Sequence, residues 1–114
     1  MEDNGVTLGQ YIAKRRRALR LTQQMVSERL HERGVDRSAQ TVAHWENDRQ
    51  DVPNDILPHL SIVLEEKSPI RLYELAGILK NLPGAEIVKL LDGAPAEDVE
   101  RIKRMIEGYF KDSK

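Results

Sequence analysis

Apolar side chains recur at helical spacing along most of this chain, and the pattern begins at Thr7. Leu8, Ile12 and Leu19 form one apolar stripe, and basic residues occupy the opposite face of the same stretch. We therefore predict a first helix that starts at Thr7, after a short N-terminal arm of residues 1–6.

Two shorter helical stretches follow, and each opens with a residue type that caps helix N-termini, Thr22 and Ser38. Gly34 interrupts the first stretch, as glycine commonly does after the last turn of a helix. Val42 and Trp45 face the same side of the second stretch, so Trp45 is predicted as a core residue rather than a stacking platform. The pattern predicts two helices joined by a loop.

The remainder of the chain also has the pattern of helices. Asn54 is predicted as the N-cap of one helix, which begins a residue or two late because Pro58 is tolerated only in a first turn. The Ser-Pro pair at residues 68–69 opens another helix. Two further helices are predicted at residues 85–91 and 96–110, after a turn rich in Pro and Gly.

The composition favours an all-α fold. The chain has one Phe, one Trp and three Tyr, so its core must be mainly aliphatic, and little in the pattern indicates strands. The absence of Cys excludes a disulfide framework, a thiol nucleophile and a Cys-based zinc site. No stretch approaches the roughly 18 apolar residues that span a bilayer, and the polar start is no signal peptide, so we expect a cytoplasmic protein.

Charge is unevenly distributed along the chain. Residues 6–50 contain nine Lys and Arg against five Asp and Glu, a net charge of +4. Residues 51–114 contain nine against twelve, a net charge of −3. A basic N-terminal half and an acidic C-terminal half fit a nucleic-acid-facing end and a partner-facing end.

The outward face of the third predicted helix carries short, uncharged side chains that can form hydrogen bonds or methyl contacts. These residues are Ala39, Gln40, Thr41, Ala43 and His44. Such a face suits the DNA major groove, where Gln40 can pair with adenine and the two alanines can contact thymine methyl groups. Thr41 and His44 can reach a base edge or a phosphate. The alternative is that this face is an ordinary solvent-exposed surface without a binding function.

The region around these two helices carries a set of residues with a known counterpart: Thr22, Gln23, Val26, Leu30, Val42, Trp45, Glu46 and Asn47. They resemble the helix-turn-helix of the Cro and lambda-repressor family, whose consensus reads T-Q-x-x-L-A and ends in I-x-x-W-E-N-G. The resemblance extends over about residues 8–75. Two departures are a longer connection at residues 31–37 and Asp48 where the family has Gly.

This resemblance implies a five-helix lambda-repressor-like DNA-binding domain at residues 7–80. Residues 81–114 are then a helical C-terminal extension for dimerisation or for a protein partner. The resemblance also implies a structural ion pair between Arg16 and Glu46, and DNA-backbone contacts from Gln23 and from the backbone amide of Asn47. Gln23 also lies at a helix N-terminus, which favours phosphate.

Further candidates for DNA-backbone contact are Arg17, Arg37, Ser38 and Arg49. For the basic run at residues 14–20, three interpretations stay open: a solvated helix face, phosphate contact, and the ion pair of Arg16. A nuclear localisation signal is a weaker interpretation of the same run.

The last predicted helix carries an apolar stripe of Val99, Ile102, Ile106 and Tyr109, spaced 3, 4 and 3 residues apart. This spacing is typical of a coiled-coil seam, but the helix is too short for a free coiled coil. It either folds back on the body or pairs with the same helix of a second chain. We favour the homodimer, because one such unit usually reads only a half-site.

The sequence favours a sequence-specific, dimeric DNA-binding regulator of the prokaryotic or phage repressor type, associated with the nucleoid. The alternative is an antitoxin or a protein-interaction module that acts through a protein antagonist or toxin partner at the C-terminal helices. An enzyme is not expected, because the three histidines are scattered and no phosphate-cradling Gly loop or nucleophile motif is present. We expect no cofactor and no metal.

Overall fold

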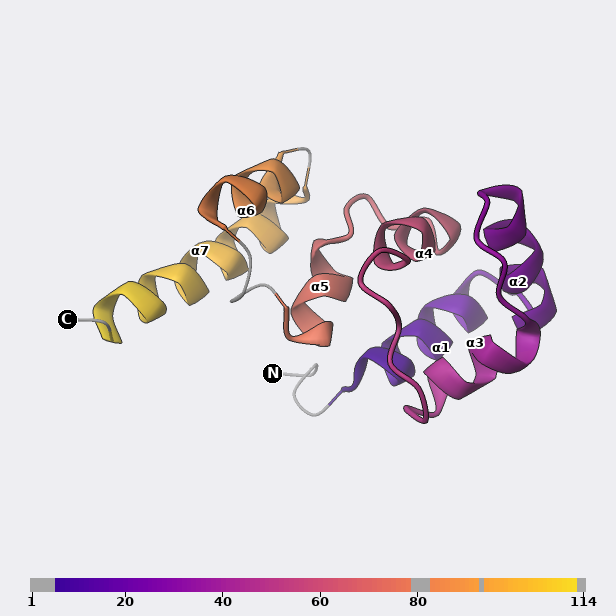
Figure 1. The fold of residues 1–114 in the computed structure, drawn as a ribbon. Helices are drawn as coiled ribbons and strands as arrows, with labels where there is room; N and C mark the ends of the chain where they lie inside the picture. Colours follow the sequence, from indigo (N-terminus) through magenta and orange to yellow (C-terminus); the bar gives the residue numbers. More distant parts are fainter. Residues whose placement is uncertain (1–5, 79–82, 93, 113–114) are drawn as a thin grey trace.

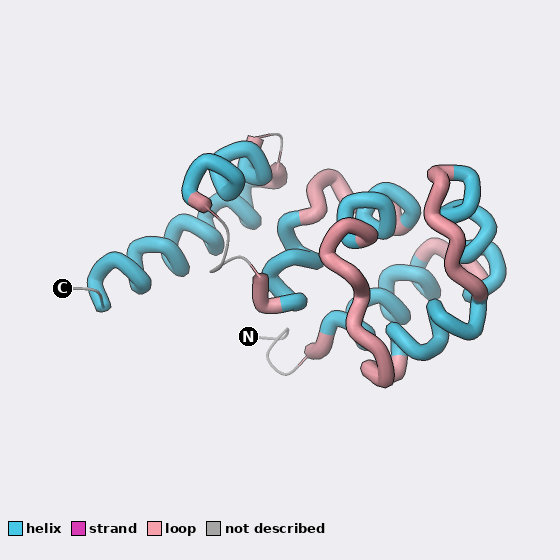
Figure 2. Tube along the Cα trace, in the orientation of Figure 1, coloured by secondary structure: helices cyan, strands magenta, loops and turns pink. Residues whose placement is uncertain are grey.

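The computed structural model describes residues 6–78, 83–92 and 94–112; the side chains of residue 90 and of residues 105–112 are not described. In these ranges all regular structure is helical, in seven helices and with no strand, which confirms the predicted all-α class (Figures 1 and 2). The helices are α1 (Leu8–Ala18), α2 (Gln23–Glu32), α3 (Ala39–Glu46), α4 (Leu57–Val63), α5 (Ile70–Ala76), α6 (Gly84–Leu91) and α7 (Ala96–Asp112).

One large apolar cluster joins the first five helices, which we call the body. Its buried members are Ile12, Leu21, Val26, Leu30, Val35, Val42, Trp45, Val52, Ile56, Leu57, Leu60, Val63, Leu64 and Leu72. Trp45 belongs to this cluster and is 2% exposed, as the sequence predicts. Its helix, α3, packs against both α1 and α2. The helices α6 and α7 lie together at the other end of the molecule, next to α5 (Figure 1).

The first three helices begin at capped N-termini. The hydroxyls of Thr7, Thr22 and Ser38 each accept a hydrogen bond from a backbone N–H in the first turn, at 3.0 to 3.1 Å. Such a cap typically stabilises a helix by about 1 kcal/mol. The predictions for Thr22 and Ser38 are confirmed.

The start of α4 is late, as Pro58 predicts, but its cap is not the predicted one. Asn54 is not an N-cap, because α4 begins three residues later, at Leu57, with no side-chain cap and with Pro58 in its first turn. The late start follows from the missing N–H of Pro58, which only the first turn tolerates. The next helix, α5, begins after the Ser-Pro pair, and the hydroxyl of Ser68 accepts from the N–H of Ile70 at 3.2 Å.

The five helices of the body end in the same way. In α1, the N–H of Leu21 donates to the carbonyl of Arg16 and the N–H of Arg20 donates to that of Arg17, both at 3.0 Å. This is the Schellman pattern, and it places one residue at positive φ. The residues in that position after the five helices are Arg20, Gly34, Asp48, Glu65 and Gly77. Gly34 ends α2 as the sequence predicts.

The helices of the described ranges include none that is long and apolar enough to cross a membrane.

Candidate nucleic-acid interface

The inner side of α3 is fixed by burial, which determines what its outer side presents. Val42 is fully buried and Trp45 nearly so, and Glu46 is 8% exposed. Gln40 and Asn47 are exposed, at opposite ends of the helix. The other candidates for base contact, Ala39, Thr41, Ala43 and His44, are half-buried. The helix therefore offers a polar, uncharged outer side without disturbing its core contacts.

The longer connection between α2 and α3 is well anchored. Val35 is buried in the main core, and its N–H donates to the carbonyl of Leu30 at 2.9 Å. The hydroxyl of Ser27 donates to the carbonyl of Arg37 at 2.6 Å, just before the N-cap residue Ser38. These contacts position the start of α3 against α2. The guanidinium of Arg37 itself is on an exposed side chain.

Three helices meet at the carboxylate of Glu46. Arg16 donates to it twice, from Nε to Oε2 at 2.5 Å and from Nη2 to Oε1 at 3.0 Å. Gln23 donates its amide Nε2 to Oε1 at 3.0 Å. The side chains of Arg16 and Glu46 are 11% and 5% exposed. This arrangement, the Glu46 clamp, ties α1 and α2 to the last turn of α3, and breaking such an enclosed pair costs about 3–5 kcal/mol.

Gln23 keeps a free donor while it holds Glu46. A carboxamide nitrogen carries two hydrogens, and one of them donates to Glu46. Gln23 is also the first residue of α2, where backbone N–H groups and the helix dipole attract anions. Its half-buried side chain can therefore serve the clamp and an anionic group at the same time.

Asp48 fixes the carboxyl end of α3 against the start of α1. Its φ of 58° is left-handed, a conformation that Asp tolerates better than most residues. Its carboxylate accepts from Thr7 Oγ1 at 2.7 Å and from the N–H of Gly9 at 3.2 Å. A Cβ at Gly9 would lie 2.3 Å from the carbonyl oxygen of Trp45, so only glycine fits there. Sequence reasoning noted Asp48 as a departure and missed these contacts.

The structure separates the basic residues of α1 into different roles. Arg15 faces the end of α4, where it donates to the carbonyl of Leu64 at 3.0 Å and pairs with Glu66 at 2.8 Å. Arg16 holds Glu46, and Arg17 is exposed. Because Arg15 is bound within the chain, it is a poor candidate for phosphate contact.

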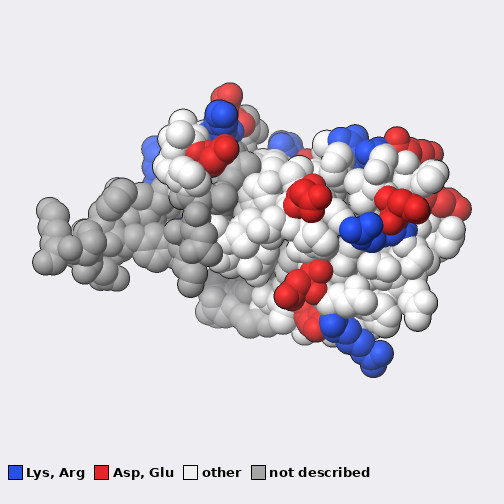
Figure 3. Space-filling model, viewed as in Figure 1, with Lys and Arg blue, Asp and Glu red and all other residues white. Residues whose placement is uncertain are grey.

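The remaining basic candidates, Arg17, Arg37 and Arg49, are all exposed. Within the described part of the chain, none of the three forms an ion pair. The visible face in Figure 3 mixes acidic and basic side chains and carries no continuous basic patch. On this face, phosphate contact would therefore depend on individual side chains and on helix N-termini.

The C-terminal stripe differs from the seam that the sequence favours. Ile102 is fully buried inside the chain, in a small cluster with Ile70. It is not available to a second chain, because α7 folds back onto α5 at this point. Val99 is half-buried. Ile106 and Tyr109 belong to α7, but their side chains lie outside the described part of the structure.

Within the described residues, no group of three or more His, Cys, Asp or Glu side chains is arranged to hold a metal ion. The chain matches no protein-family profile, no curated protein and no solved structure. The assignment of function therefore depends on the chain's own residues and geometry.

Proposed function

We propose that this protein is a sequence-specific DNA-binding transcriptional regulator with a Cro- and lambda-repressor-like helix-turn-helix, in which α3 reads the major groove. The observation that carries the proposal is the division of α3 into two sides. Trp45 and Glu46 anchor the inner side, and the outer side presents Gln40 and neighbouring short side chains. A rigid helix with exposed short polar groups is the usual reader of base edges.

The chemistry of the outer side suggests which bases it would prefer. Gln40 can accept from N6 and donate to N7 of one adenine. Ala39 and Ala43 can contact thymine methyl groups, and His44 can bond to a base edge or a phosphate. We therefore expect an operator half-site that contains A·T pairs opposite α3.

Affinity would come mainly from the phosphate backbone. Arg17, Arg37 and Arg49 supply exposed charge, and Gln23 supplies a donor at the N-terminus of α2. Ser38 and the backbone amide of Asn47, at the two ends of α3, would complete the backbone contacts. These groups set the register of α3 and carry little sequence information themselves.

The regulator is proposed to bind as a homodimer, with two copies of α3 in successive major grooves about 34 Å apart. Because Ile102 is buried within the chain, the contact between copies would have to use other residues of the stripe or another surface. A pseudo-palindromic operator would follow from the two-fold symmetry of such a pair.

Selection of binding sites from a random DNA pool, followed by a salt titration, tests this proposal. We expect an inverted repeat with half-sites one helical turn apart, and an affinity that falls steeply as salt increases. Gln40→Ala should relax the preference at one base pair and cost about 1–3 kcal/mol. Lys89→Ala, on exposed α6, is the control and should leave binding unchanged. Failure of the pool to enrich any sequence would contradict the proposal.

The alternative function is a protein-interaction module, such as an antitoxin, that acts through its C-terminal helices. The exposure of Val88 on α6, 66%, is the observation that favours it. Replacing Gln40 and Thr41 together by Ala distinguishes the two functions. This change should abolish regulation if DNA reading is the function, and should leave function intact if a partner on α6 and α7 is responsible.

A further inference from the structure

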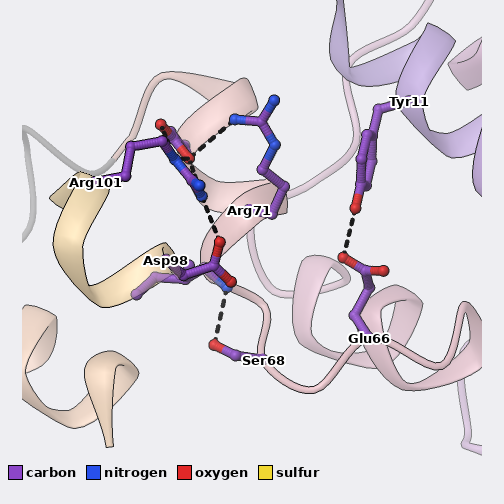
Figure 4. Close-up of polar contacts among 8 residues, drawn as sticks. Tyr11, Glu66, Ser68, Arg71, Asp98 and Arg101 are labelled. Carbon is purple, nitrogen blue, oxygen red and sulfur yellow. Dashed lines mark hydrogen bonds and ion pairs between the residues drawn. The ribbon is translucent and has the colours of Figure 1, made fainter. Parts of the chain in front are cut away.

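A cluster of ion pairs joins α7 to α5 (Figure 4). The Nε of Arg101 donates to both carboxylate oxygens of Glu74, at 2.9 and 3.0 Å, and its Nη2 lies 2.6 Å from Asp98 Oδ1. Arg71 binds the same Glu74 from α5, at 3.1 Å. Glu74 thus lies between two guanidinium groups, one from each side of the contact. We call these four residues the Arg101 cluster.

Among the described side chains, the apolar part of this contact is small, and one of its members, Tyr73, also packs against the main core. Ile70 of α5 and Ile102 of α7 are fully buried, with Tyr73, Ile87 and Leu91 partly buried around them. The main core, in contrast, draws all its described members from residues 8–78, and none from α6 or α7. Removal of α6 and α7 would therefore leave the main core of the body complete.

The Arg101 cluster is charged and partly open to solvent. Burial lowers the pKa of Arg101, but hydrogen bonds and charge attraction from Asp98 and Glu74 outweigh that effect and raise it overall, so the guanidinium stays ionised. The side chain of Arg101 is 36% exposed and those of its partners Glu74 and Asp98 are 17% and 16% exposed. In the Glu46 clamp, the side chains of Arg16 and Glu46 are 11% and 5% exposed. Salt screens solvent-exposed charges most and buried or partly buried pairs much less, so the Arg101 cluster is more open to screening than the more enclosed Glu46 clamp.

We propose that α6 and α7 form a releasable arm, held on α5 by the Arg101 cluster, which detaches as ionic strength rises while α1–α5 stay folded. Detachment uncovers Ile70 on the body and Ile102 on the arm together. An increase in ionic strength would therefore expose an apolar surface on the body and on the arm. The Arg101 cluster is independent of the proposed DNA binding, since none of its residues lies in α3 or the Glu46 clamp.

The chain has no Cys and a single Trp, which allows a clean test. Cysteines introduced at two exposed positions, Lys67→Cys on the body and Glu100→Cys on the arm, accept a pair of spin labels. The distance between the two labels shows whether the arm is attached to the body or detached from it. The fluorescence of Trp45, which is buried in the main core, shows at the same time whether the body is folded.

Raising salt from about 0.1 M to about 1 M shortens the Debye length from about 10 Å to about 3 Å. We expect a second, longer label distance to appear over this range, with Trp45 fluorescence unchanged. Arg101→Ala should produce the longer distance already at low salt and raise its population about tenfold, as loss of a charged hydrogen-bond partner does. The control is Arg104→Ala, an exposed arginine on the same helix, which should behave as the parent chain.

Two results would overturn the proposal. One is a single, short distance at every salt concentration in both the parent and Arg101→Ala. The other is a longer distance that appears only together with a change in Trp45 fluorescence, because the arm and body would then unfold as one unit. Neither result bears on binding-site selection, so the proposed function stands or falls separately.

Discussion

The body and the arm are stabilised by different means. The body packs fourteen described buried side chains into one cluster, whereas the described contact between α5 and α7 fully buries two, Ile70 and Ile102. Each region also has an arginine that pairs with a glutamate of another helix. The side chains of Arg16 and Glu46 are 11% and 5% exposed, and those of Arg101 and Glu74 are 36% and 17% exposed. The Glu46 clamp is therefore a fixed junction, whereas solution conditions can loosen the Arg101 cluster.

The largest expected effect comes from truncating the main core. Trp45→Ala should lower the free energy of unfolding by about 3–5 kcal/mol, because it leaves a cavity among α1, α2 and α3. Urea denaturation followed by far-UV circular dichroism measures this change. Ile102→Ala is the matching truncation in the arm and should leave the main transition in place. An equal loss in both variants would contradict the separation of the two regions.

Arg16→Ala should cost nearly as much as the core truncation, about 3–5 kcal/mol, because it leaves the buried carboxyl group of Glu46 without its guanidinium partner. Arg101→Ala should change the main transition by less than about 1 kcal/mol, since its pairs are partly exposed. Thermal unfolding followed by Trp45 fluorescence compares the two. A similar shift in both variants would mean that the Arg101 cluster stabilises the body as well.

A smaller effect is expected at the junction of α3 with α1. Asp48→Ala should cost about 1–2 kcal/mol, because it removes the hydrogen bonds to Thr7 and Gly9 and keeps the left-handed backbone. Asp48→Gly should cost less, since glycine relieves the backbone strain of that conformation. The midpoints of urea denaturation rank the variants. The reverse ranking would show that backbone strain at this position is negligible.

The smallest effect concerns Tyr11 of α1, whose hydroxyl donates to Glu66 in the turn between α4 and α5 at 2.7 Å. Burial, and then its hydrogen bond to Glu66, raise the pKa of Tyr11 far above its model-compound value of 10.0. The unfolded chain therefore loses this proton near pH 10 while the folded chain keeps it, so stability falls as pH rises above about 10. Tyr11→Phe should make this fall shallower in urea denaturation between pH 9 and pH 11. An unchanged slope would show that another group is responsible.

Local signals predicted the helices of this protein best. Thr22, Ser38 and Gly34 mark helix ends through contacts within a few residues, and the structure has the same ends. Apart from the pair of Arg16 and Glu46, which the family resemblance implied, the contacts between distant residues were not predicted. The bonds from Thr7 and Gly9 to Asp48, and from Arg101 to Glu74, join positions 27 to 41 residues apart.

The run of basic residues in α1 illustrates the same limit for the candidate site. Arg15, Arg16 and Arg17 are chemically alike and consecutive, and no pattern within the run assigns them to separate tasks. The structure separates them because successive helical positions point about 100° apart, toward α4, toward α3 and toward solvent. The role of Arg16 could be anticipated only through the family resemblance.

The shared ending of α1–α5 has a consequence for how the chain folds. Each of these ends is closed by hydrogen bonds between residues no more than five positions apart, such as Leu21 to Arg16. Such local contacts lose little loop entropy when they form, and helical proteins rich in them fold in microseconds to milliseconds. The ends of the five helices can therefore form before the side chains of the core pack together.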